Sequence, residues 1–250
     1  MFFFRRKNTD SQFLANFLSN IETDIHSHLI PGIDDGVQEV DTSVAFIGQL
    51  HELGIKKIIT TPHIMMDRYP NSADTIALPF QKLQAALTEA RLDIPFKHAA
   101  EYYMDEYFEE LMKAPLLTLN GELVLVEISF MSAPPQLHNW IFTLEAQGYR
   151  PIMAHPERYA YGHANFDLYH QFKKMGCLLQ VNLLSLTGYY GKHIQQAAEK
   201  LVADKMIDYI GTDLHHEKHL QAITAIGKNK KVLKVLDQYP FKNRELTSQA

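Results

Sequence analysis

The chain has 250 residues, a hydrophobic fraction of 46% and a formal net charge of -5, so it can bury one sizeable core and is expected to form a single domain. Its 24 basic and 29 acidic residues do not collect into long blocks, which argues against a nucleic-acid partner. A single cysteine, Cys177, excludes an internal disulfide, and no run reaches the length of a membrane helix, so we expect a cytoplasmic protein.

The two ends of the chain differ in composition from the segment between them. Three phenylalanines precede a basic trio in MFFFRRKNTDSQ, whereas a secretory signal places its basic residues before a long apolar core. We expect residues 2–7 to be a frayed or locally packed extension, with a weak interfacial role as the alternative. The polar tail over residues 242–250 is predicted to be disordered, which leaves a core of about residues 22–238.

Seven short apolar runs recur along the chain and predict strands. They are IETDIHSH, IKKIITTPH, IPFKHAAEYY, ELVLVEIS, RPIMAHPE, CLLQVNLLS and IDYIGTDLHH. Most lack strict alternation, as strands buried on both faces do. Helical spacing occupies residues 42–53, 76–92, 136–147, 167–175 and 194–204, and a final helical stretch is expected over 217–236. This alternation predicts an α/β fold with parallel strands and crossover helices.

Each of the seven runs ends in a polar side chain, and most of these side chains can bind metal. They are His26 and His28, His63, Glu101, Glu127, His155, Asn182, and Asp213 with His215. The carboxyl ends of parallel strands converge on one rim of a barrel, whereas an open sheet would spread them along an edge. The pattern therefore favours a (β/α) barrel with an active site at that rim.

Taken together, these strand ends predict a metal centre. His26 and His28 lie two residues apart on a strand, so their imidazoles face the same side. Taken singly, each histidine could be an ordinary core or surface group, and Glu101, Glu127 or Asp213 could cap a helix. Jointly, five imidazoles and three carboxylates exceed the needs of one catalytic zinc and suggest about two or three ions. Ligands without thiolate suit manganese, zinc or iron, and such clusters suit phosphoryl hydrolysis.

Two loops beside the predicted ligands carry further candidates. Arg158 follows His155 by three residues in AHPERY, where a guanidinium can form paired hydrogen bonds to phosphate oxygens. A salt bridge with Glu157 or a loop contact is the alternative. In IPGIDDG, Asp34 and Asp35 are expected on a rim loop. Either could donate a proton to the leaving oxygen or orient the attacking water, and a turn or cap role is the alternative.

Other catalytic schemes find no support in the sequence. A cysteine phosphatase needs an arginine six residues after its cysteine, and Leu183 stands at that position after Cys177. No phosphate-binding loop of the G-x-x-x-x-G-K-[ST] type and no G-x-S-x-G elbow occurs, which removes the usual nucleotide-hydrolysing and serine-hydrolase readings. His216 and His219 are expected to be solvated rim groups or helix-start residues.

The motifs DIHSHLIPGIDDG, TTPH, AAEYY, LVEIS, AHPERY, LLQVNLLSLTGYYG and IGTDLHH resemble the polymerase and histidinol phosphatase (PHP) superfamily. Over about residues 22–216 the chain is similar to its bacterial metal-dependent tyrosine-protein phosphatases of the CpsB/CapC type. The resemblance implies a distorted, TIM-like seven-stranded (β/α) barrel and a trinuclear site supplied with manganese. By motif match, Arg158 would contact phosphate. The implied ligands are His26, His28, His63, Glu101, Glu127, His155, Asp213 and His215.

The resemblance also implies a substrate: phosphotyrosine in the tail of a membrane tyrosine autokinase that regulates capsular or extracellular polysaccharide. The family often has another basic residue shortly after the last ligand, and this chain has Lys218 and His219 there without an arginine.

Three other functions stay open. They are a phosphatase of a small metabolite such as histidinol phosphate, an amidohydrolase-like enzyme, and a regulator without catalysis. Amidohydrolases usually take a histidine where this chain has Asn182. Loops 65–74 and 187–192 would leave the rim open for a phosphopeptide or close it over a metabolite. Tyr189 and Tyr190 in the second loop are expected either to stack on a substrate ring or to pack on the barrel.

Overall fold

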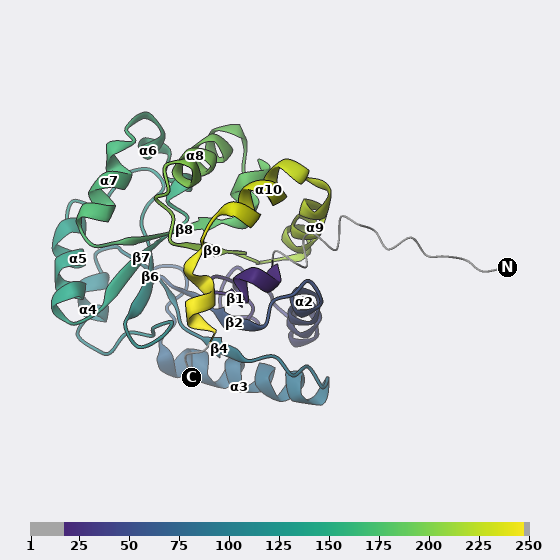
Figure 1. Cartoon of the computed structure of the whole chain (residues 1–250). Coiled ribbons are helices and arrows are strands. Elements are labelled where there is room, and N and C mark those ends of the chain that lie inside the picture. Colours follow the sequence, from purple (N-terminus) through teal and green to yellow (C-terminus); the bar gives the residue numbers. More distant parts are fainter. Residues whose placement is uncertain (1–17, 248–250) are drawn as a thin grey trace.

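The computed structural model describes residues 18–247. The predictions for residues 2–7, and for residues 248–250 of the tail, lie outside this range. In Figure 1 the helices surround a central group of strands, and the C-terminal segment, drawn in yellow, crosses in front of those strands. None of the described helices is long and apolar enough to cross a membrane.

The strands form two parallel sheets, which confirms the predicted α/β class. The smaller sheet has the order β1-β2-β4, and the larger has the order β3-β5-β6-β7-β8-β9. Every pair of neighbouring strands is parallel. The strands are β1 (Thr23–Asp24), β2 (Lys57–Thr60), β3 (His63–Ile64), β4 (Phe96–His98), β5 (Glu101–Tyr103), β6 (Leu123–Glu127), β7 (Arg150–Ala154), β8 (Leu178–Asn182) and β9 (Tyr209–Gly211).

Two of the predicted runs are each divided into two strands, so the seven runs give nine described strands. β2 and β3 belong to one run, as do β4 and β5, and in both cases the second strand joins the larger sheet. An isolated parallel bridge pairs Ser27 with Leu214, and the His28 N–H donates to the Leu214 carbonyl at 3.0 Å. The first run of the chain is therefore hydrogen-bonded to the last.

Five predicted helices are found with ends that differ by a few residues. They are α2 (Val40–Glu52), α3 (Ala73–Glu89), α5 (Leu137–Ala146), α7 (Asp167–Lys174) and α8 (Lys192–Ala203). The sequence analysis missed the short elements α4 (Phe108–Leu111), α6 (Ala160–Ala164), η1 (Pro156–Arg158) and η2 (Leu183–Thr187). Because these elements are only three to five residues long, they show almost no helical periodicity.

The helical stretch predicted over 217–236 is present, but it is interrupted. It divides into α9 (Glu217–Ala225), η3 (Ile226–Lys228) and α10 (Lys230–Gln238). Asn229 ends the first part and caps the second, because its side chain accepts a hydrogen bond from the Val232 N–H at 3.2 Å. Asparagine competes with the helical backbone in this way and favours the position before a helix.

The predicted disorder of the tail is wrong for residues 242–246, which form η4 (Lys242–Leu246). Asn243 is fully buried, donates to the carbonyls of Thr23 and Ile210 at 2.9 and 2.7 Å, and accepts from the Ile210 N–H at 3.0 Å. Leu246 packs in an inner apolar cluster with Ile25, Ile59 and other side chains from the strands. The C-terminal segment therefore joins β1 to β9 at the amino ends of the strands.

The strands are apolar because both of their faces are covered. All residues of β6 and β8 are buried, as expected for parallel strands between an inner core and an outer layer of helices. A second, larger apolar cluster lies between strands and helices and includes Leu50, Val126, Leu144 and Leu201. This packing holds the carboxyl ends of the strands in fixed positions beside one another.

Candidate metal centre

All eight predicted ligands come together: Glu127 ends β6, five others follow β1, β7 or β9, and His63 and Glu101 begin β3 and β5, just beyond the carboxyl ends of β2 and β4. Their donor atoms form four overlapping groups, and within each group the atoms lie within 4.8 Å of one another. Asp35 joins as a ninth residue. The groups are His28, Asp35, His63 and His215; His26, Glu101 and His155; His26, His28 and Asp213; and His63, Glu101 and Glu127.

Glu101 lies at the middle of this cluster. Its Oε2 atom lies 3.2 Å from His26 Nε2 and 3.2 Å from His63 Nδ1, and its Oε1 atom lies 3.1 Å from His155 Nε2. The parallel pairing of β3 with β5 places His63 directly beside Glu101. The carboxylate therefore contacts the imidazoles of His26, His63 and His155 and would serve with them as a ligand if divalent cations bind.

Two members of the cluster adopt a backbone conformation that is unusual for their residue types. His155 has φ 30° and Asp213 has φ 50°, in the left-handed region that side chains with a Cβ rarely occupy. Both follow the last residue of a strand closely, and the turn directs each side chain back over the strand ends. Strain of this kind often accompanies functional sites because the surrounding fold must impose it.

Hydrogen bonds behind the cluster orient three of the imidazoles. His26 Nδ1 lies 2.8 Å from Gln180 Oε1, and His28 Nδ1 lies 2.8 Å from Asp34 Oδ2. His215 Nδ1 lies 2.9 Å from the Asp213 carbonyl. An acceptor at Nδ1 keeps the proton on that nitrogen and leaves the Nε2 lone pair directed at the cluster, as in metal-binding histidines.

The motif IPGIDDG is explained by this arrangement. Asp34 is buried, orients His28, and also accepts from the N–H groups of His63 and Gly36, each at 3.0 Å. A Cβ atom on Gly36 would lie 2.2 Å from the His28 carbonyl oxygen, so the chain can pass there only as glycine. Asp35 faces the cluster instead, with Oδ1 3.6 Å from the Nε2 atoms of both His63 and His215.

A buried amide network, which the sequence analysis missed, supports the other side of the cluster. Gln180 donates to Asn182 Oδ1 at 2.9 Å, and Asn182 donates to Asp213 Oδ2 at 2.6 Å. Both amides are completely buried. The signal available in the sequence was a glutamine within the otherwise apolar strand LLQVN, since a buried polar side chain needs a partner.

Electrostatics at the cluster favour the ionised forms of Glu101 and Asp213, whereas burial and the Glu101 charge raise the pKa of Glu127 well above its usual range. Burial would raise the pKa of Glu101, but His26, His63 and His155 lower it well below its usual range. Burial would likewise raise the pKa of Asp213, and the neighbouring imidazoles and Arg158 lower it.

The imidazole of His155 is neutral by contrast, because burial and Arg158 lower its pKa to about 4. Buried carboxylates, together with imidazole nitrogens held in the ligating tautomer, form a donor set that fits divalent cations.

Arg158 is held beside the cluster on three sides. Its Nη1 donates to Asp213 Oδ2 at 3.2 Å, and its guanidinium lies 4.6 Å from the ring centre of Phe130 and 5.1 Å from that of Tyr190. The alternative of a salt bridge to Glu157 is wrong. Glu157 is fully buried and accepts instead from the Asn182 N–H and from Ser185, and burial raises its pKa to about 7.

Comparison with known proteins decides the family. The model of the family named for capsular polysaccharide synthesis, CpsB/CapC, matches residues 22–233. The chain belongs to the CpsB/CapC family. This confirms the resemblance found in the motifs.

The tyrosine-protein phosphatase YwqE of Bacillus subtilis (strain 168) is 28% identical over 197 residues, which cover 78% of this chain and 78% of YwqE. The tyrosine-protein phosphatase CpsB of Streptococcus pneumoniae is 26% identical over 200 residues and covers 77% of this chain and 82% of CpsB.

A solved structure from the same family has a similar fold. It belongs to a crystallographic study of YwqE and CpsB, which describes both as unique metal-dependent tyrosine phosphatases. The two chains superpose with a TM-score of 0.74 at 25% identity, and the match covers 88% of this chain and 96% of the other. The parallel α/β architecture of this CpsB/CapC protein is therefore that of a solved family member.

In this CpsB/CapC protein the cluster opens into a cavity of about 590 Å³, a volume typical of small-molecule and side-chain binding sites. Arg158 and Tyr190 line one part of it, and Met65, Arg68 and Tyr69 from the loop after β3 line another. Tyr190 has a buried hydroxyl without a hydrogen-bond partner within residues 18–247. Its ring contacts Arg158, whereas Tyr189 is 41% exposed and packs edge-on against Tyr190 and His219.

The two histidines after the last predicted ligand have different surroundings. His216 is exposed and caps α9, because its side chain accepts from the His219 N–H, in agreement with a helix-start role. His219 is not a solvated group. It is buried, with Nδ1 3.0 Å from the Asp213 carbonyl, and it lines the cavity. Helical spacing places it on the buried face of α9.

Proposed function

We propose that this CpsB/CapC protein is a metal-dependent tyrosine-protein phosphatase, a phosphoric monoester hydrolase that acts on phosphotyrosine in a protein. The observation that carries the proposal is the cluster of eight side chains that could bind metal, six of which line a single cavity together with the Arg158 guanidinium. Family members with the same architecture are named tyrosine-protein phosphatases, and the solved ones are described as metal-dependent.

The resident cofactor in this proposal is a cluster of about two or three divalent cations, with Mn²⁺ as the first candidate and Zn²⁺ or iron as alternatives. When bound, such cations activate water near neutral pH and offset the charge of phosphoryl oxygens. The donor groups that surround Glu101 support this assignment. The proposed ligands are His26, His28, His63, Glu101, Glu127, His155, Asp213 and His215.

The remaining side chains bind and orient the substrate. Arg158 is placed to donate hydrogen bonds to the phosphoryl oxygens, which offsets charge as the bond to phosphorus breaks. The rings of Phe130 and Tyr190 on either side of it restrict its rotamers and keep its N–H groups toward the cavity. We assign Tyr190 to this support and to the wall that meets the substrate ring, and Tyr189 to the rim.

Asp35 acts in this proposal as a hydrogen-bond acceptor. The adjacent His215 imidazole lowers the pKa of Asp35 to about 2, so the carboxylate is ionised near neutral pH and holds no proton to donate to a leaving oxygen. It is placed to orient the attacking water. The phenolate leaving group needs less acid assistance than an alkoxide because the pKa of tyrosine is about 10.

The strands are proposed to close into a distorted barrel of seven strand segments within one domain. The pairing of Ser27 with Leu214 supports closure because it connects the first segment with the last. The C-terminal η4 helix supports the single domain because it joins β1 and β9. Residues 242–246 of the polar tail then belong to this domain.

We further propose that the substrate is the phosphotyrosine tail of a membrane tyrosine autokinase that regulates capsular or extracellular polysaccharide, and that the protein acts in the cytoplasm. The family's description, capsular polysaccharide synthesis, supports this context.

The function is tested with protein stripped of metal by a chelator and then supplied with Mn²⁺. Hydrolysis of a phosphotyrosine peptide is measured beside hydrolysis of histidinol phosphate, and His26→Ala serves as the variant that should lose metal and activity together. We expect Mn²⁺ to restore turnover of the peptide with a strong preference over histidinol phosphate. Preference for histidinol phosphate would instead assign the same centre to a metabolite, and full activity without metal would refute the mechanism.

A further inference from the structure

The cavity has a second guanidinium at its mouth, on the wall formed by the loop after β3. Arg68 lines the cavity and its side chain is exposed. Arg158 is deeper and mostly covered, with 25% of its side chain exposed, and it is paired with Asp213. The two cations therefore occupy an outer and an inner position along the path into the site.

Arg68 has no salt bridge with any residue in the part of the chain that the structure describes. Carboxylates are present nearby, because Asp67 precedes it and Asp105 follows β5 at the adjacent strand end. The Arg68 charge also affects two tyrosines of the cavity wall. Burial raises the pKa of Tyr69 and Tyr103, and the Arg68 guanidinium offsets part of that rise. Its charge is therefore available to a ligand in the cavity mouth.

The loop that carries Arg68 is ordered by its own hydrogen bonds. Met65 and Tyr69 form an antiparallel bridge, and the Arg68 N–H donates to the Met65 carbonyl at 3.0 Å. The Tyr69 ring stacks on His63 with centroids 5.6 Å apart and planes 12° apart. Asn71 fastens the end of the loop through donation to the carbonyls of His63 and Ile33, at 2.9 and 2.8 Å.

A turn held in this way fixes the Cα position of Arg68 relative to the metal centre, because Tyr69 and Asn71 both contact His63. The Arg68 side chain can then occupy only positions over the cavity mouth, so less conformational entropy is lost when it binds a ligand. A phosphoryl group at Arg158 leaves the neighbouring residues of a peptide at the mouth, within reach of such a side chain.

We propose that Arg68 is a specificity-determining residue that binds the carboxylate of an acidic residue next to the phosphotyrosine. This inference rests on the proposed phosphatase function and adds a preference for acidic phosphopeptides. The pair is partly exposed, so the expected preference is modest, about two- to fivefold in kcat/KM. It should also weaken as salt is added, because exposed charges are screened.

The test compares two phosphotyrosine peptides that differ only in having glutamate or glutamine on either side of the phosphotyrosine. p-Nitrophenyl phosphate, which has no flanking residues, is measured in parallel with the Mn²⁺-supplied protein. The variant is Arg68→Gln. Its matched control is Arg150→Gln, which removes the same charge from an exposed side chain at the amino end of β7.

In the wild type and in Arg150→Gln, kcat/KM for the glutamate peptide should be about two- to fivefold higher than kcat/KM for the glutamine peptide. In Arg68→Gln the two values should be equal. The glutamate-to-glutamine ratio is taken within each protein, so a change in the turnover of p-nitrophenyl phosphate common to both peptides does not alter it. A glutamate preference that persists in Arg68→Gln, or no preference in the wild type, would overturn the inference and leave the phosphatase function intact. Failure of the wild type to hydrolyse p-nitrophenyl phosphate or either peptide would overturn the proposed function and this inference together.

Discussion

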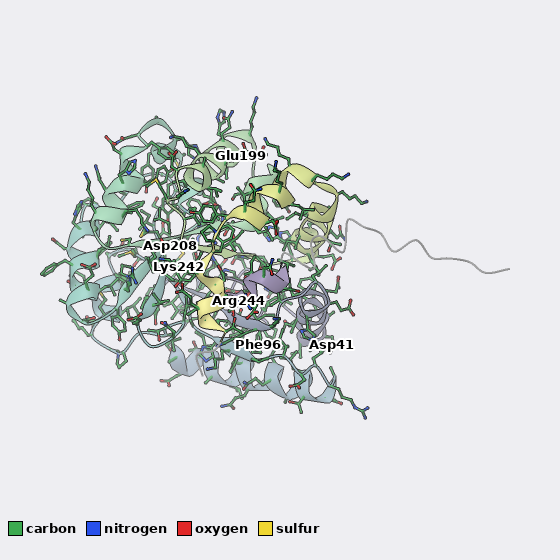
Figure 2. The ribbon with its side chains drawn as sticks, in the orientation of Figure 1. Asp41, Phe96, Glu199, Asp208, Lys242 and Arg244 are labelled. Atoms are coloured by element: carbon green, nitrogen blue, oxygen red, sulfur yellow. The ribbon has the colours of Figure 1, made fainter. Side chains whose placement is uncertain are left out.

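Buried carboxylates at the two ends of the strands have different kinds of partner. At the amino ends, Asp208 lies between the ammonium groups of Lys173 and Lys242, and Glu22 contacts Lys56 and Arg244. Figure 2 shows Asp208 beside Lys242, with Arg244 farther along the same C-terminal segment. At the carboxyl ends, Glu101 faces imidazoles instead.

This difference separates groups that stabilise the fold from groups that serve the site. Lysine and arginine are permanent cations, so the amino-end carboxylates are neutralised by the chain itself. At the carboxyl ends the nearby carboxylates outweigh burial and raise the pKa of His26 and His28. Imidazoles bind cations only in their neutral form, so bound divalent cations would take over the balancing of the carboxylate charge there. We therefore expect charge removal at the amino end to reduce stability and charge removal at the carboxyl end to reduce metal binding and activity.

The largest effect is expected for Glu101→Gln, which keeps the shape of the side chain and removes its charge. Because the carboxylate contacts imidazoles from three strand ends, kcat/KM for a phosphotyrosine peptide should fall by more than about a hundredfold, beyond the loss typical for a residue that only supports a ligand. Bound Mn²⁺ per chain should fall as well. Full metal content and full turnover in this variant would show that Glu101 is not a ligand.

Arg158→Ala should impair activity without loss of metal. Removal of one donor that stabilises charge costs about 2–4 kcal/mol of transition-state stabilisation, which is measured as a decrease in kcat/KM with Mn²⁺ content determined on the same sample. An unchanged kcat/KM would remove Arg158 from the mechanism, and a parallel loss of Mn²⁺ would make it a support for Asp213 instead.

At the opposite end, Asp208→Asn should reduce stability and leave kcat/KM and metal content unchanged. The variant keeps an acceptor for the Leu179 N–H, which Asp208 Oδ2 binds at 3.0 Å, but it leaves two ammonium groups without their carboxylate. The free energy of unfolding in urea should fall by about 2 kcal/mol at neutral pH.

The stability difference between Asp208→Asn and the wild type should depend on pH. Burial opposes ionisation of Asp208, but hydrogen bonds from Lys173 and Lys242 outweigh it and lower its pKa below the ordinary 3.8. A carboxylate with a lowered pKa stabilises the folded state above its unfolded pKa and loses that contribution as the pH falls through the folded value. The difference should therefore be largest near neutral pH and disappear in acid. If the free energies of unfolding of the two proteins differed by the same amount at neutral pH and in acid, the ion-pair explanation would be contradicted.

The smallest effect is expected for Phe130→Leu, which removes one of the two rings beside Arg158. The loss of a partly buried cation–π contact is worth about 1 kcal/mol, and kcat should fall about fivefold. Phe142→Leu is the matched control, because Phe142 is 72% exposed on α5. In an Arg158→Ala background the Phe130→Leu change should have no further effect. A fivefold loss in that background would mean that Phe130 acts on the substrate, or through His155, which its ring contacts edge-on, rather than through Arg158.

The same comparison explains which features the sequence could predict. The ligands at the carboxyl ends stand directly after apolar runs, so a linear pattern contains both the strand and the polar residue that follows it. The residues that orient them do not share this pattern. Gln180 forms a hydrogen bond with His26, which is 154 positions away in the sequence, and the segment LLQVN gives no indication of that partner.

The contacts at the amino ends of the strands likewise could not be predicted from the sequence pattern. Asn243 lies in a polar segment, and its three hydrogen bonds go to main-chain atoms of Thr23 and Ile210, so composition alone predicted disorder. The division between α9 and α10 could have been predicted, because Gly227 and Asn229 are both helix-end signals. The burial of His219 depends on which face of α9 packs against the strands.

We infer that the carboxyl-end cluster holds several cations, and the stoichiometry of bound Mn²⁺ tests this most directly. Protein stripped of metal is dialysed against buffered Mn²⁺, and bound metal per chain is measured for the wild type, Glu101→Gln and Asp208→Asn. The account predicts about two or three ions for the wild type and Asp208→Asn, and fewer for Glu101→Gln. No bound ion in the wild type, or the same number in all three proteins, would contradict it.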